Sequence, residues 1–72
     1  MKAGEILRLS DHVEYITTWD DPGLQGNIVG KFTCNDFCIS LEQEFDDGVC
    51  TFIKVLVDGN AVWLDKDYLR SF

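Results

Sequence analysis

The stretch KVLVDGNAVWLDKDYLRSF, Lys54 to Phe72, decides the predicted fold. Apolar and polar residues alternate on both sides of the tripeptide DGN, a pattern typical of two antiparallel strands joined by a tight turn. Both two-residue registers of that turn place Val62 and Leu64 toward the core and Trp63 away from it. The residues DKD then interrupt the strand, and we expect a single 3₁₀ turn there. The closing segment YLRSF follows, with Leu69 as its expected core contact.

Two earlier turns divide the chain into further strands. Asn35-Asp36 predicts a two-residue hairpin turn between residues 28–34 and 37–45, because Asn and Asp tolerate the left-handed conformation that such a turn demands. The residues DDG, 46–48, predict a three-residue turn with glycine at the left-handed position. The resulting registers place one set of apolar residues inward: Ile28, Phe32, Phe37, Ile39, Leu41, Ile53, Val55 and Val57.

The first 27 residues complete the predicted architecture. GEILRL, residues 4–9, reads as the first strand, and a long stretch at 10–27 follows it. The middle of that stretch, VEYITTW, is rich in residues that favour strands, so we expect an irregular hairpin folded over one end of the sheet. The prediction is one domain, residues 1–72, with five short antiparallel strands closed into a small barrel, because closure hides the sheet edges.

Both ends of the chain carry a resemblance to a known fold. MKAGEILRL at the start, and VLVDGNAVWL, the one-turn break and DYL at the end, resemble an SH3-like barrel. The chain is more narrowly similar to the very small SH3-like proteins of tailed phages. The resemblance implies an all-β, five-stranded antiparallel SH3-like barrel with a long early, RT-like loop and a short 3₁₀ turn before the last strand. The ALYDY, paired-tryptophan and FPSNYV segments of Src-homology-3 domains are missing, so a proline-rich ligand is not implied.

Charge is the strongest compositional signal, with 13 acidic residues against 6 basic ones and a net charge of -7. Phosphate contacts need Lys and Arg, so we expect no direct nucleic-acid binding. The acidity favours a basic protein partner, or only solubility. No apolar run approaches the roughly 20 residues of a spanning helix, and the N-terminus lacks the apolar region of a signal peptide. We therefore expect a cytoplasmic protein without membrane contact, in the host cytoplasm if a phage encodes it.

Nothing in the sequence predicts catalysis, a metal site or a cofactor. The three cysteines, Cys34, Cys38 and Cys50, are an odd number without a signal peptide, which favours reduced thiols. The spacing CNDFC is wider than that of a zinc knuckle. The single histidine lies in SDH, residues 10–12, whereas a catalytic triad is assembled from separate segments. We expect a protein that is not an enzyme.

The candidate partner-binding residues are aromatic and acidic. Trp63 points outward, so either the long early stretch covers it in a second small core or a partner does. The resemblance implies that Tyr68 is a ligand-contacting aromatic and that acidic residues of the early loop pair with a basic ligand residue. We predict a groove walled by Trp19 and Trp63, with Asp20 and Asp21 at its rim, that receives a basic segment of a partner protein. The alternative for these acidic residues is a solvated loop.

The outer face of the sheet offers a second surface. Phe52 and Leu56 are predicted to point away from the core, and they mark either an interface or a strongly bent sheet covered on both faces. Three functions follow from these features. The first is a non-enzymatic protein-interaction module. The second is an acidic nucleic-acid mimic that inhibits a host nuclease or another DNA-binding protein. The third is a structural homodimer, and we expect a monomer or a weak dimer.

Overall fold

The structure is a computed structural model, and it describes residues 1–22 and 26–72. The described chain forms seven strands: β1 (Ile6–Leu9), β2 (Tyr15–Trp19), β3 (Ile28–Thr33), β4 (Cys38–Asp46), β5 (Thr51–Val57), β6 (Asn60–Asp65) and β7 (Leu69–Ser71). A single 3₁₀ turn, η2 (Lys66–Tyr68), precedes β7, as predicted. The all-β prediction is confirmed, but the expected number of five strands is wrong. The long early stretch supplies a paired strand of its own, β2, and the residues after η2 pair with β1.

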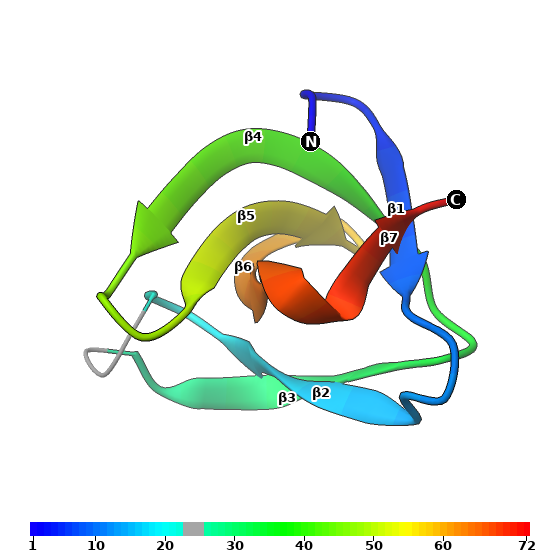
Figure 1. The fold of residues 1–72 in the computed structure, drawn as a ribbon, viewed down its shortest axis with the longest axis horizontal. Helices are drawn as coiled ribbons and strands as arrows, with labels where there is room; N and C mark the ends of the chain where they lie inside the picture. Colours follow the sequence, from blue (N-terminus) through cyan, green and yellow to red (C-terminus); the bar gives the residue numbers. More distant parts are fainter. Residues whose placement is uncertain (23–25) are drawn as a thin grey trace.

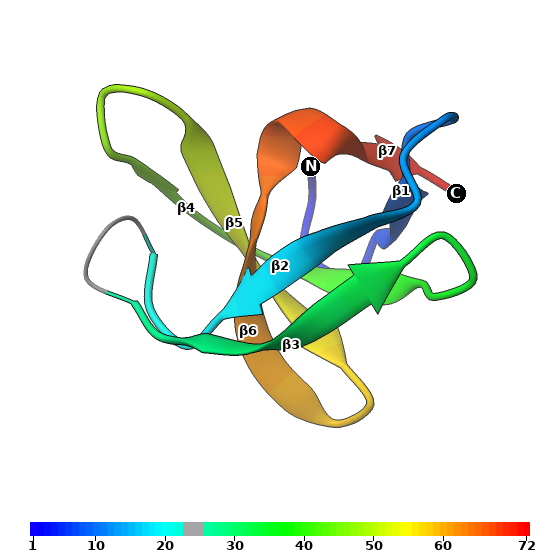
Figure 2. The ribbon, with the colours of Figure 1, turned by 90° about the horizontal axis from the view of Figure 1, so that it is seen from below.

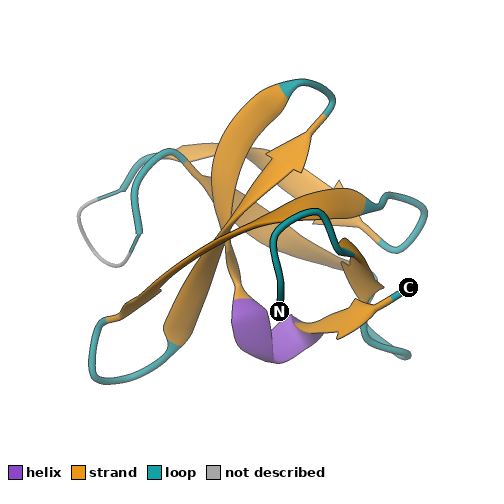
Figure 3. Ribbon diagram, turned by 90° about the horizontal axis from the view of Figure 1, so that it is seen from above, coloured by secondary structure: helices purple, strands orange, loops and turns teal. Residues whose placement is uncertain are grey.

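All the strands belong to one antiparallel sheet in the order β3-β2-β6-β5-β4-β1-β7. The sheet is strongly curled: β4 and β5 arch over β6, and the β2–β3 hairpin passes along the opposite side (Figures 1 and 2). The η2 turn connects β6 to β7 (Figure 3). The result is a half-barrel that encloses one core. Within the described residues, no helix is long and apolar enough to cross a membrane.

The core fills the concave side of the curled sheet. Its buried members come from every strand except β2: Leu7, Leu9, Phe32, Cys38, Ile53, Val55, Val62, Leu64 and Leu69. Strand β2 contributes Ile16, which is half-buried against this core. The predicted inward positions of Val62, Leu64 and Leu69 are confirmed, and Trp63 lies on the outer side, half-buried.

The β5–β6 turn explains why this part of the prediction holds. Val57 and Asn60 are paired, so Asp58 and Gly59 form a two-residue loop. Both residues have positive φ, 50° and 81°, as the hairpin turn with two left-handed positions requires. These two turn residues therefore set the register of both flanking strands, and the alternation of side chains along each strand then determines which of them face the core.

The predicted β3–β4 hairpin is wrong. The turn closes one residue earlier: the Asp36 carboxylate accepts hydrogen bonds from the Thr33 N–H and hydroxyl, each at 2.9 Å, and the Asp36 N–H donates to the Thr33 carbonyl at 3.0 Å. Strand β3 consequently pairs with β2 alone, while β4 passes between β5 and β1.

The change of partner reverses the face of β4. Cys38 and Ser40 are buried, whereas Phe37 and Ile39, predicted inward, are exposed. A register shift of one residue exchanges the two faces of a strand. The error in the predicted turn therefore puts the side chains at the start of β4 on the opposite face from the one predicted. Ile28 on the edge strand β3 is also exposed rather than inward.

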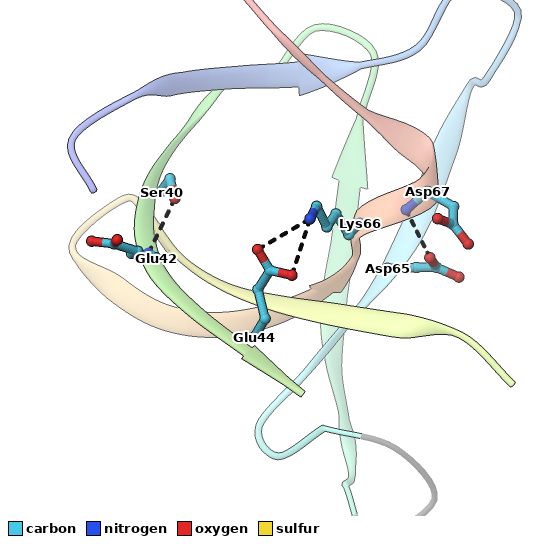
Figure 4. Close-up of polar contacts among 6 residues, drawn as sticks. All are labelled: Ser40, Glu42, Glu44, Asp65, Lys66 and Asp67. Atoms are coloured by element: carbon cyan, nitrogen blue, oxygen red, sulfur yellow. Dashed lines mark hydrogen bonds and ion pairs between the residues drawn. The ribbon is translucent and has the colours of Figure 1, made fainter. Parts of the chain in front are cut away.

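A wide bulge then bends β4. Ser40 pairs with Val55 and Glu44 with Ile53, so residues 41–43 stand opposite Lys54 alone. Glu42 has a φ of 71°, and its N–H donates to the Ser40 hydroxyl at 3.1 Å (Figure 4). The buried residues of β4, Cys38 and Ser40, lie before the bulge, and residues 42–46 are exposed. The tip of the β4–β5 hairpin also differs from the prediction: Asp46 pairs with Thr51, beyond the predicted three-residue turn.

Candidate functional site

An aromatic groove lies between β2, the ends of β5 and β6, and the η2 turn. It has a volume of about 490 Å³. Three strands and two connecting segments supply its lining: Val13, Tyr15, Ile16, Thr17, Trp19, Phe52, Asp65 and Tyr68. An open, mostly apolar hollow with one carboxylate has the chemistry of a site for a peptide side chain.

Strand β2 positions one wall of the groove. Tyr15, Thr17 and Trp19 alternate along β2 and therefore share a face. Trp19 is the cross-strand partner of Trp63 on β6, the one register pair between these strands. Both tryptophans are half-buried, so Trp63 is neither fully covered nor fully exposed. Trp63 is not among the residues that line the groove.

The η2 turn positions the opposite wall. The Tyr68 carbonyl accepts hydrogen bonds from the Ser10 N–H at 2.8 Å and the Ser10 hydroxyl at 3.1 Å. The Asp65 carboxylate caps the turn by accepting from the Asp67 N–H at 3.0 Å (Figure 4). Lys66 reaches back to Glu44 on β4, with its ammonium 3.0 and 3.1 Å from the two carboxylate oxygens. These contacts hold the Tyr68 backbone while its ring stays accessible.

Asp65 is the carboxylate that lines the groove, and it has acidic neighbours. Burial raises the pKa of Asp65 above its ordinary value, and repulsion from Asp67 and Asp47 adds to the effect. Burial also raises the pKa of the Cys50 thiol, together with the negative charges of Asp65, Asp47, Asp67 and Asp46. We call Asp46, Asp47, Asp65 and Asp67 the acidic cluster. Two hairpin ends far apart in sequence bring it together.

Sequence reasoning missed the acidic cluster as a site. DDG and DKD are predicted as a turn and a strand break, and local patterns carry no signal that the two segments meet. The curl of the sheet creates that proximity. The available signal was an acidic pair at the end of β4 and another at the end of β6.

The predicted partner-binding residues divide into two groups. Trp19 and Tyr68 line the same groove. Asp20 instead accepts a hydrogen bond from the Asn27 N–H across the β2–β3 hairpin, and this bond lowers the Asp20 pKa. Asp20 lines a separate hollow of about 390 Å³ with residues of β3 and of the β5–β6 hairpin. Asp21 is exposed next to it, so neither carboxylate is among the groove-lining residues.

The predicted interface residues also divide. Phe52 is buried, so its assignment to an exposed interface is wrong, and its remaining exposed edge lines the groove. The ring lies on the outer face, as alternation requires, but β2 and the chain before it cover that end of the sheet. Leu56 is half-buried on the same face, farther along β5.

The three cysteines are free thiols in three different environments. Cys34 is exposed, Cys50 is half-buried and Cys38 is buried. Burial raises the pKa of Cys38 to about 12. Among the described residues, no three His, Cys, Asp or Glu side chains lie close enough together to hold a metal ion.

Comparison of the chain with protein-family models, with curated protein sequences and with solved structures gives no match. Function is therefore argued from the geometry of the site itself.

Proposed function

We propose that the chain is an SH3-like barrel of the kind found in tailed phages, acting as a non-enzymatic interaction module that binds a basic segment of a partner protein. The binding site is the aromatic groove, with the acidic cluster at one end. Trp19, Tyr68 and Asp65 make the direct contacts in this proposal, while Trp63 supports Trp19 from the neighbouring strand.

The strand order supports the SH3-like part of the proposal. Without the β2–β3 hairpin, the sheet order is β7-β1-β4-β5-β6, five strands in which the two chain ends pair with each other. The hairpin is inserted between the first and second of these strands, where the resemblance implies a long RT-like loop. The η2 turn precedes the last strand, where the resemblance implies a 3₁₀ turn.

Charge complementarity supports the basic character of the partner. The groove combines ring faces with the Asp65 carboxylate, whose raised pKa reflects partial burial and like-charged neighbours. A ligand Arg or Lys would relieve that repulsion and lie over an aromatic ring at the same time. The chain already contains one contact between a cation and a groove-lining ring, since the Lys31 ammonium lies 4.6 Å from the centre of the Tyr15 ring. This coincidence of rings and crowded carboxylates is the observation that carries the proposal.

Selection from a random 12-residue peptide display library tests the proposal. We expect the selected peptides to be enriched in Arg or Lys next to apolar residues. Tyr68→Ala should weaken their binding by about 30-fold or more, as expected for an aromatic hot spot. Asp65→Asn should weaken it less and should reduce its salt dependence.

Phe37→Ala is the matched control, because Phe37 is an exposed aromatic residue that is not in the groove. Equal loss of binding with Phe37→Ala and Tyr68→Ala, or selected peptides without basic residues, would contradict the proposal. Far-UV circular dichroism of each variant separates loss of the site from loss of the fold.

The acidic cluster also supports the second candidate, an acidic mimic of nucleic acid that inhibits a host nuclease or another DNA-binding protein. In that case, binding to a basic nucleic-acid-binding protein would fall steeply with salt and would survive Tyr68→Ala. Groove binding depends on the rings and would not survive it. A salt titration of wild type and Tyr68→Ala therefore distinguishes the two functions.

A further inference from the structure

An uncharged row of side chains crosses the outer face of the sheet. Ile6 pairs with Ile39, Ile39 with Leu56, and Leu56 with Ala61, so four neighbouring strands contribute one residue each. Phe72 continues the row beyond β7, because its N–H donates to the Ile6 carbonyl at 2.9 Å. Cross-strand partners share one face of a sheet, so these five side chains form a continuous strip, the outer row. Figure 1 shows β1, β4, β5 and β6 side by side along this path.

The outer row is exposed at its β1 end. The exposed fractions are 77% for Phe72, 46% for Ile6 and 40% for Ile39. Phe37 stacks edge-on against Phe72 with 6.1 Å between ring centres and is itself 62% exposed. With about 200 Å² for a phenylalanine side chain and slightly less for isoleucine, these four leave roughly 400 Å² of apolar surface in contact with water. That is within the range of the largest patches on monomers, which often serve binding.

This area matches the apolar centre of a dimer interface. A standard interface buries about 800 Å² on each partner, of which roughly 450–500 Å² is apolar. The outer row with Phe37 supplies most of that apolar share, and the surrounding polar side chains would supply the rim.

The distribution of charge favours a second copy as the occupant. Copies with a net charge of -7 repel each other, so they approach most easily through a face without carboxylates. The outer row contains no charged side chain, and Arg70 and Lys54 flank it two positions along β7 and β5. The acidic cluster lies instead at the far ends of β4, β5 and β6.

We propose that the outer row is the interface of a symmetric homodimer. A two-fold axis through the strip places Ile6, Ile39 and Phe72 of one copy against the same strip of the other, which buries both patches at once. None of the five outer-row residues lines the aromatic groove, so the dimer does not use the groove residues themselves.

Sedimentation equilibrium of the chain between about 10 μM and 1 mM tests this proposal. We expect wild type to show a reversible monomer–dimer equilibrium in that range. Ile39→Lys should weaken dimerisation at least tenfold, because a symmetric interface then contains two ammonium groups and loses two apolar side chains. Phe37→Ser is a second variant, outside every strand, that should also weaken the dimer without disturbing the barrel.

Val49→Lys is the matched control, because Val49 is 92% exposed at the tip of the β4–β5 hairpin, off the outer row. It should leave dimerisation unchanged. Added NaCl should preserve or strengthen the dimer, since salt screens the repulsion between the acidic copies. A wild-type monomer at 1 mM, an equal loss with Val49→Lys, or a dimer that dissociates with salt would each overturn the proposal.

Discussion

Two adjacent residues of β4 test the observed register most sharply. Cys38 is 1% exposed and Ile39 is 40% exposed, although the sequence pattern predicts the opposite orientation for both. Substitution of each by lysine therefore puts the same charged side chain on the two faces of one strand. The structure predicts very different costs for the two variants.

The expected magnitudes follow from burial. Fully burying an isoleucine side chain contributes about 1.5–3 kcal/mol to stability. Ile39 is 40% exposed, so its burial contributes little more than half of that amount. The aliphatic part of a lysine recovers some of these contacts, so Ile39→Lys should cost about 1 kcal/mol. Cys38→Lys forces an unpaired ammonium into the core and should cost more than about 4 kcal/mol. A domain of this size has a total stability of about 4 to 11 kcal/mol, so the second variant should lose at least about a third of its stability and should unfold if the wild type lies at the lower end of that range.

Urea unfolding, followed by tryptophan fluorescence and far-UV circular dichroism, measures the loss of unfolding free energy in each variant. With a slope of about 1 kcal/mol per molar urea, Ile39→Lys should lower the midpoint by about 1 M and keep a cooperative transition. Unfolding of the protein by Ile39→Lys, together with a native transition in Cys38→Lys, would contradict the observed orientation of β4. That result would restore the predicted β3–β4 hairpin.

Three further predictions concern the turns. Asp36→Ala removes the acceptor of two hydrogen bonds from Thr33 and should cost about 1–2 kcal/mol in urea unfolding, whereas a cost near zero would mean that this turn does not hold β3 apart from β4. Gly59→Ala should cost about 1 kcal/mol, because its φ of 81° is strained for alanine although its surroundings are open, and an unchanged midpoint would contradict the Asp58-Gly59 turn geometry. Hydrogen bonds from the backbone N–H groups of Cys50 and Val49 lower the pKa of Asp47 below 3.8, so the ionised carboxylate stabilises the fold above that pH, and this stabilisation disappears as the pH falls through the lowered value. Asp47→Asn should therefore make the melting temperature depend less on pH below pH 3.8. An unchanged pH dependence of the melting temperature would refute this role.

The sequence predicts the C-terminal half of the fold well because its determinants are local. The Asp58-Gly59 turn and the alternation around it place Val62 and Leu64 in the core and Trp63 outside without reference to any other strand. The same local reasoning fails at β4. Asn35-Asp36 is compatible with a hairpin, and the choice of β1 rather than β3 as the second neighbour of β4 depends on the closure of the whole sheet.

The candidate site follows the same division. Trp19 and Tyr68 could be selected from residue type, alternation and the resemblance, and the curled sheet brings them to one groove. The carboxylates chosen from the early stretch, Asp20 and Asp21, belong to a different part of the surface. The acidic cluster that does adjoin the groove depends on two hairpin ends meeting, which is a property of the tertiary structure alone.

Amide and indole chemical-shift changes on addition of a selected basic peptide locate the binding site on the protein. We expect the largest changes at the Trp19 indole and at the backbone of Asp65 and Tyr68, with Ile39 and Phe72 unaffected. Changes centred on the outer row, or spread evenly over carboxylates around the whole surface, would contradict the assignment of the aromatic groove as the binding site.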